Sequence, residues 1–242
     1  MLNDPVQFLK GVGPKRALYL GELGIKTVWD LLTHFPREHE DRSEKIPIAH
    51  VQPGTFKTLR GRVEGFEVIP VGRSLGLGKA LLFDGTGYIW AIWFRRTSPQ
   101  YDAFETLTKK LVKGTQLLVH GHIERNHTDL QVRVDEYEVL SQEHPAPTIH
   151  VDRLVPIYPL TEGLDARWLR ELIWTALNEH LAEAKDYLPG PFLEKYRLAP
   201  LAWAVQKLHF PADWAERDRA RRRLAFEDFF FLELALALSR ER

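Results

Sequence analysis

The chain has 242 residues and no net charge, because 33 Lys and Arg balance 33 Asp and Glu. Hydrophobic residues make up 44% and charged residues 27%, which is typical of a globular protein with a sizeable core. The absence of cysteine excludes disulfides and thiolate metal sites, and no stretch is apolar over the roughly 20 residues that span a bilayer. We therefore expect a cytoplasmic protein without a membrane partner. Any contact with nucleic acid must come from local clusters of positive charge.

The first segment, residues 1–50, predicts short helices that are interrupted by glycines. Residues 9–17 read Leu-Lys-Gly-Val-Gly-Pro-Lys-Arg-Ala, a pattern typical of a helix-hairpin-helix. The N–H groups that begin its second helix would hold a DNA phosphate together with Lys15 and Arg16. A purely structural turn with solvated basic residues explains the same pattern.

The second segment, residues 51–145, changes to a strand pattern. We expect a helix at 101–112, and we expect strands at 55–68, 80–83, 88–94, 116–123 and 130–140. Five strands with one helix between the third and the fourth predict an OB-type β-barrel. The alternative is an open five-stranded sandwich.

An aromatic and basic cluster follows the third expected strand. OB barrels bind nucleic acid by stacking bases on aromatic rings, while basic residues neutralise the backbone. We predict that Phe94 and Tyr101 stack on bases and that Arg95 and Arg96 hold phosphates. Strand alternation puts Phe94 and Trp93 on opposite faces, so the alternative is that Phe94 packs in the core.

Gly78-Lys79 resembles the end of a phosphate-binding P-loop, but Arg73 and Ala80 occupy the positions where Gly and Ser or Thr are required. We therefore expect no ATP site, and we interpret Gly72, Gly76 and Gly78 as a hairpin loop. Its basic residues, Arg73 and Lys79, are further candidates for phosphate binding.

Neither a metal site nor a catalytic group is expected in this chain. His120, His122 and His127 lie close together but lack a carboxylate at ligand spacing, so they do not predict a metal site. No serine, histidine and carboxylate arrangement or carboxylate pair predicts a catalytic residue.

The third segment, residues 146–242, predicts helices from about 168, 200 and 213. Five arginines between 217 and 223 form either a phosphate track or a solvated helix face. From Phe229 to Leu238 the last helix is apolar on nearly every side, so it should be buried. We expect a further part of a longer protein to cover it.

Together these motifs resemble the N-terminal wedge region of the RecG family of ATP-dependent DNA helicases. The matching segments, in the family's order, are 11–15, 23–32, 35–37, 40–42, 156–164, 209–211 and 220–227. Phe94 matches the first stacking aromatic of that family. Tyr101 matches the second across a longer loop, and Arg95 and Arg96 stand where Asn and Gln are usual.

The resemblance implies an α+β wedge, with the barrel flanked by the helix-hairpin-helix-like segment and the C-terminal helices. Such a wedge binds the branch point of stalled replication forks and Holliday junctions in DNA repair and recombination. It splits the arms while motor domains, absent from this chain, use ATP and magnesium. No cofactor and no enzymatic activity are then expected here. The alternative is an OB-fold protein-docking module without direct DNA contact.

Overall fold

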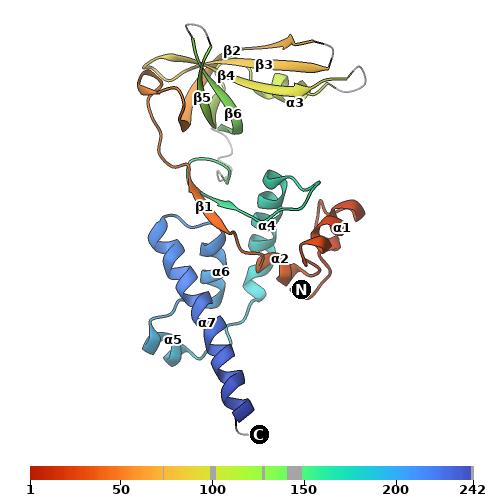
Figure 1. Cartoon of the computed structure of the whole chain (residues 1–242), viewed down its shortest axis with the longest axis vertical. Coiled ribbons are helices and arrows are strands. Elements are labelled where there is room, and N and C mark those ends of the chain that lie inside the picture. The colour runs from red at the N-terminus through yellow and green to blue at the C-terminus, as the bar shows by residue number, and fades with distance from the viewer. Residues whose placement is uncertain (73, 99–101, 127–128, 141–148, 241–242) are drawn as a thin grey trace. The chain divides into compact units, whose positions relative to one another are not determined.

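The computed structural model describes residues 1–72, 74–98, 102–126, 129–140 and 149–240 (Figure 1). The chain forms two compact units. One is the continuous stretch Asp41–Arg153, and the other combines Met1–Glu40 with Leu154–Arg242. The two outer segments, which the sequence pattern separates as 1–50 and 146–242, thus share one unit. Their union depends on contacts between residues far apart in the chain, such as those of α2 (Val28–Leu32) with α4 (Ala166–His180).

The continuous unit is a closed five-stranded barrel in the strand order β2-β3-β4-β6-β5. Its elements are η2 (Ile48–His50), β2 (Phe56–Pro70), β3 (Leu75–Phe83), β4 (Tyr88–Arg96), α3 (Glu105–Lys110), β5 (Gln116–Asn126) and β6 (Asp129–Leu140). Neighbouring strands are antiparallel except β4 and β6, which run parallel. This arrangement confirms the predicted OB-type barrel, and the open sandwich is wrong.

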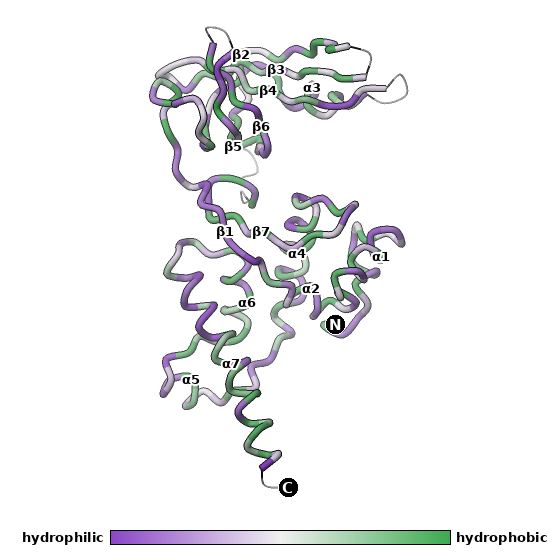
Figure 2. The backbone as a smooth tube through the Cα atoms, in the orientation of Figure 1, coloured by the Kyte–Doolittle hydropathy of each residue, from purple (hydrophilic) through white to green (hydrophobic). Residues whose placement is uncertain are grey.

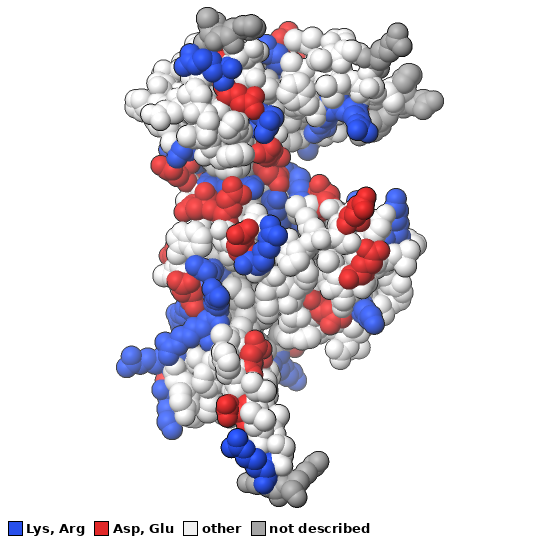
Figure 3. Space-filling model, viewed as in Figure 1, with Lys and Arg blue, Asp and Glu red and all other residues white. Residues whose placement is uncertain are grey.

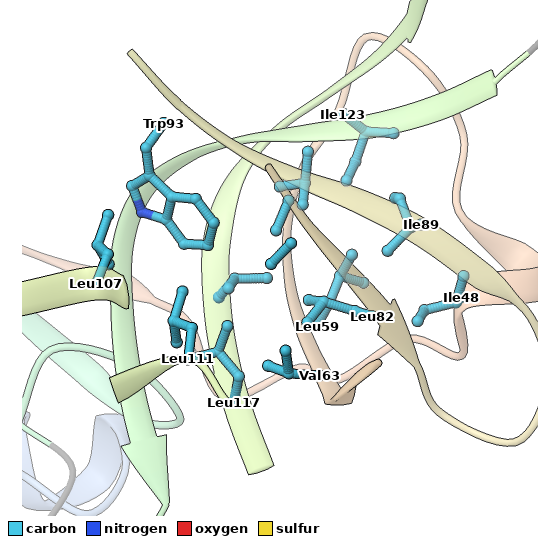
Figure 4. Packing of buried hydrophobic residues seen from close by; sticks show 14 of the residues in the cluster. Ile48, Leu59, Val63, Leu82, Ile89, Trp93, Leu107, Leu111, Leu117 and Ile123 are labelled. Carbon is cyan, nitrogen blue, oxygen red and sulfur yellow. The ribbon is translucent and has the colours of Figure 1, made fainter. Parts of the chain in front are cut away.

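Side chains on alternate strand positions fill the barrel (Figure 4). Leu59, Leu82 and Ile89 come from β2, β3 and β4, and all three are almost completely buried. Trp93 points into the same core and is only 5% exposed. Burial of apolar surface stabilises folding by roughly 25 cal/mol per Å², so these inward rows are the main source of the barrel's stability.

The segment of α3 adds Phe104, Leu107 and Leu111 to this core. Gly76 and Gly78 make room for the Phe104 ring, because a Cβ atom at either position would lie 2.6 or 2.8 Å from a ring carbon. Both glycines belong to β3, so their interpretation as a hairpin loop is wrong. The physical reason is a close contact with a distant aromatic ring, which strand periodicity does not reveal.

The other unit is mostly helical. Its elements are η1 (Val6–Phe8), α1 (Pro14–Glu22), α2, β1 (Glu38–Asp41), β7 (Leu154–Ile157), α4, η3 (Leu181–Glu183), α5 (Gly190–Tyr196), α6 (Leu201–His209) and α7 (Trp214–Arg240). The short strands β1 and β7 pair with each other. The second half of α7 extends past α5 and α6 (Figure 1) and is predominantly hydrophobic (Figure 2). Within the described ranges, no helix has the length and apolarity needed to cross a bilayer.

A fully buried histidine joins three segments of the helical unit. His209 Nε2 lies 2.9 Å from the Leu32 carbonyl oxygen, and Nδ1 lies 2.8 Å from the Tyr158 hydroxyl. Since a carbonyl only accepts, Nε2 carries the proton and donates it, while Nδ1 accepts from Tyr158. Burial lowers the pKa of His209 to about 4, so the ring is neutral near pH 7.

Candidate nucleic-acid interface

Phe94 lies on the outer face of the barrel. Its side chain is 50% exposed, whereas the preceding Trp93 is buried. In the strand register Phe94 stands opposite Leu77 on β3, and Leu77 stands opposite Ile69 on β2. Directly paired residues project to the same side of a sheet. The three side chains therefore form an apolar row across β2, β3 and β4, and the alternative that Phe94 packs in the core is wrong.

The two arginines after Phe94 lie on opposite faces. Arg96 pairs with Leu75, is exposed, and extends the outer face by one row. Arg95 pairs with Gly76, on the inner side, and its guanidinium donates a 2.7 Å hydrogen bond to the Ala103 carbonyl oxygen. Only Arg96 is thus positioned beside Phe94 without a hydrogen bond or ion pair to another described residue.

Lys79 lies on the same outer face, two positions along β3 from Leu77. It stands opposite Ile92, and its Nζ lies 4.0 Å from the centre of the Trp90 ring. Such a cation–π contact holds the ammonium close to the sheet. The apolar row is therefore flanked by Arg96 on one side and, on the other, by Lys79, which stands opposite Glu67 on β2. The remaining barrel candidates, Tyr101 and Arg73, lie outside the described residues.

The helix-hairpin-helix-like segment belongs to the other unit. Gly11 has a φ of +89°, and Gly13 is the N-cap of α1, as the tight turn requires. The element before the turn is only the 3-10 turn Val6–Phe8, so a complete first helix is not formed.

The two basic residues of that turn have different surroundings. Arg16 donates a 2.9 Å hydrogen bond to the Gly11 carbonyl and lies 4.5 Å from the Trp168 ring centre. Lys15 is exposed. The contacts of Arg16 stabilise the turn, and Lys15 is the freer of the two cations.

The arginines between residues 217 and 223 of α7 also differ in their surroundings. Arg223 is fully buried and forms ion pairs with Asp186, at 3.0 Å, and with Glu227. Arg222 is exposed and reaches the Tyr196 carbonyl oxygen at 3.3 Å. The run is therefore partly structural, and neither of the two interpretations of the sequence describes all of it.

Basic and acidic side chains are interspersed over the visible surface (Figure 3). This mixture agrees with the zero net charge. A nucleic-acid-binding face must therefore be recognised from a local group of residues, such as the row of Phe94. Within the described ranges, no group of three or more His, Asp or Glu side chains is arranged to hold a metal ion. His120 instead contacts the Thr58 hydroxyl at 3.0 Å.

Sequence reasoning missed Leu77 and Ile69, which complete the row of Phe94. The missing information was the register between β2, β3 and β4. The first barrel strand was expected to end at residue 68 and the second to begin only at residue 80, so both residues fell outside the expected strands. The inward orientation of Arg95 could have been found, since it shares the parity of Trp93 on one strand.

Comparison with known proteins identifies a family. A family model described as the RecG wedge domain matches residues 5–179. The ATP-dependent DNA helicase RecG of Thermotoga maritima is 32% identical over 97% of this chain and 29% of its own length. The RecG of Escherichia coli K12 is 27% identical over 96% of this chain and 33% of its own length.

A solved structure, RecG bound to a three-way DNA junction, is similar over 100% of this chain and 32% of that chain. Its TM-score is 0.82 and its sequence identity is 30%. The chain therefore spans about a third of the length of the relatives that it matches. With the family model matching most of the chain and the fold agreeing over all of it, this chain belongs to the RecG wedge-domain family.

Proposed function

We propose that this chain binds the branch point of forked and four-way DNA and separates the arms in the cytoplasm. Motor domains of the same parent protein would supply the movement by hydrolysing ATP. The observation that carries the proposal is the exposed Phe94 in its apolar row, with Arg96 and Lys79 on either side. The similar RecG structure, bound to a three-way DNA junction, supports the same ligand class.

The physical argument begins with the bases at a branch. A branch exposes unpaired or end-stacked bases, which a flat aromatic ring can cap without regard to sequence. Leu77 and Ile69 widen the apolar surface on which such a base lies. Phosphates beside that base would contact Arg96 and Lys79, which position the DNA without reading its sequence. Tyr101 is proposed as a second stacking residue.

Replacing Phe94 with Ala tests this function. We expect weaker binding to forked DNA by about 1–3 kcal/mol, with little change for linear duplex of equal length, because the branch adds open bases to the duplex ends that both DNAs have. Val139, which is also exposed on a barrel strand, provides a matched control as Val139→Ala. Fluorescence anisotropy with both DNAs and a thermal melt of each variant give the answer. Equal fork binding by Phe94→Ala and wild type would contradict the proposal.

The same apolar row favours one competing function, a protein-docking module without DNA contact. The two functions differ in their dependence on salt. Binding that neutralises phosphates weakens steeply as salt rises, with a slope of about −0.9 per phosphate for duplex DNA, whereas docking on an apolar surface does not. Fork affinity that is independent of salt would favour the docking module.

We also propose that the chain by itself turns over no ATP and holds no cofactor, ATP and magnesium being bound by the motor domains. Gly78 and Lys79 pair with Trp93 and Ile92 inside a sheet, whereas a P-loop leaves its N–H groups open before a helix. We expect no ATP hydrolysis by the purified chain, with or without forked DNA. Turnover that copurifies with the chain through several columns would contradict this.

A further inference from the structure

A second aromatic and basic cluster lies at the hairpin end of β3 and β4, away from Phe94 along the same face. Arg62, Phe83 and Tyr88 are directly paired across β2, β3 and β4. The rings of Phe83 and Tyr88 are stacked, with centroids 4.6 Å apart and planes 27° apart. Tyr88 is 60% exposed, so one side of this stacked pair faces solvent.

A groove of about 570 Å³ borders Phe83 of this pair, while Tyr88 lies outside its lining. Its lining includes Phe83, the hairpin turn, and three cationic side chains, Lys45, Arg60 and Arg62. Gln116, which pairs with Arg62 on β5, adds an amide that can bond to a base edge. An aromatic wall, several cations and an amide are the groups that bind a nucleotide.

The carboxylates around the groove are already engaged. Asp84 accepts hydrogen bonds from the backbone N–H groups of Ile48, at 2.8 Å, and Thr86, at 2.8 Å. Burial tends to raise the pKa of Asp84, but these hydrogen bonds outweigh burial and hold it below its usual range. The Asp84 charge is thus used to fix the turn.

The cations differ in availability. Lys45 pairs with Asp152 and Arg62 pairs with Glu64, each at 2.7 Å. The two cations are 42% and 50% exposed, whereas Asp152 and Glu64 are 28% and 19% exposed. Ion pairs at the surface contribute only about 0–1 kcal/mol, so a phosphate can compete for the cations. Arg60 is exposed and makes no hydrogen bond or ion pair with any residue that the structure describes.

We propose that this groove is a second binding site for single-stranded DNA, with a base on the Phe83–Tyr88 pair and phosphates on Arg60 and Arg62. The ligand class rests on the proposed function, but the site does not use Phe94. Leu77 and Phe83 are six residues apart on β3, so the two sites are roughly 20 Å apart along the strand. An OB barrel covers about 4–16 nucleotides of single strand, so one strand can occupy both.

Binding of a labelled oligothymidylate to the complete chain measures the site. Tyr88→Ala should weaken binding about tenfold, and Tyr88→Phe should restore it, because the ring and not the hydroxyl stacks. Arg60→Ala should reduce the slope of log affinity against log salt by about 0.7, the value for one phosphate of a single strand. Lys110→Ala, an exposed lysine on α3, is the matched control and should change neither quantity.

Photocrosslinking locates the strand directly and separates this site from the one at Phe94. An oligothymidylate that carries 5-iodouracil should form an adduct with the peptide that contains Tyr88, in wild type and in Phe94→Ala. Such an adduct would support DNA binding at the groove even if Phe94→Ala bound forked DNA as tightly as wild type, a result that would contradict the proposed function. If Tyr88→Ala and Arg60→Ala bind like Lys110→Ala, and no adduct forms at Tyr88, the groove is not a DNA site.

Discussion

The two arginines that follow Phe94 differ in what they already contact. Arg95 donates a hydrogen bond to the Ala103 carbonyl oxygen and lies 5.9 Å from the centre of the Phe104 ring. These contacts hold the end of β4 against the α3 segment, whose Phe104 packs in the barrel core. Arg96 is exposed on the outer face. The sequence assigns both to phosphate binding, whereas their positions suggest different effects on binding and on stability.

We predict that these effects separate on mutation. Arg96→Ala should lower the slope of log fork affinity against log salt by about 0.9, because one phosphate contact is lost. Arg95→Ala should leave that slope nearly unchanged and lower the free energy of unfolding by about 0.5–1.5 kcal/mol, the usual contribution of a hydrogen bond. Salt titrations and urea unfolding of both variants measure the two quantities. Equal changes in slope would show that Arg95 also binds phosphate.

At the scale of single elements, prediction succeeded where periodicity was undisturbed and failed where a distant partner decided the structure. The helix predicted from 168 and the last helix from 213 agree with α4 and α7 within a few residues. The second barrel strand was expected from residue 80 but begins at Leu75, because Gly76 and Gly78 face Phe104. The helix α5 has only seven residues, too few for a periodic pattern to stand out, and the strand β1 is polar throughout.

The buried contacts of His209 with Leu32 and Tyr158 should make the stability of the helical unit depend on pH. The pKa of His209 is about 4 in the folded chain and about 6.5 when unfolded. Above pH 6.5 both states are neutral and the histidine has no effect. Below it the unfolded state gains a proton that the buried ring cannot accept, so stability falls as pH falls towards 4.

We therefore expect wild type to lose about 2 kcal/mol more unfolding free energy than His209→Gln between pH 7 and pH 5, from 1.36 kcal/mol per pH unit below 6.5. Urea unfolding followed by circular dichroism at both pH values measures this difference. Other titrating groups are common to the two proteins and cancel. His180→Gln, a partly exposed histidine at the end of α4, is the control. Parallel pH profiles for wild type and His209→Gln would show that this ring does not cause the loss.

At the scale of the whole molecule, the barrel was predictable and the second unit was not. All strands of the barrel lie in one stretch, Asp41–Arg153, so local patterns were sufficient to identify it. The helical unit joins two segments that are more than a hundred residues apart in sequence, and contacts such as His209 with Leu32 leave no local signal. Part of the candidate interface could be predicted from the sequence. The alternation of side chains along one strand separates Phe94 from Trp93, but only the register between β3 and β4 places Leu77 beside Phe94.

The exposed end of α7 determines our last prediction, which concerns association of whole molecules. Phe229 and Leu238 are 68% and 57% exposed, and further apolar side chains between them are also exposed, namely Phe231, Leu232, Leu234 and Leu236. A contiguous apolar surface of this kind favours association. In the parent protein we propose that the motor domains cover it.

We expect the isolated chain to associate as its concentration rises, and a chain that ends at Asp228 to remain monomeric. That shorter chain keeps the buried Arg223 and its partners Asp186 and Glu227, so the helical unit should stay folded. Leu232→Gln with Leu236→Gln, one helical turn apart, reduces the apolar surface at full length, and Leu160→Gln is a matched control at an exposed leucine elsewhere. Sedimentation equilibrium measures the mass of each protein. A full-length chain that is monomeric at the highest attainable concentration would show that the exposed end of α7 does not drive association.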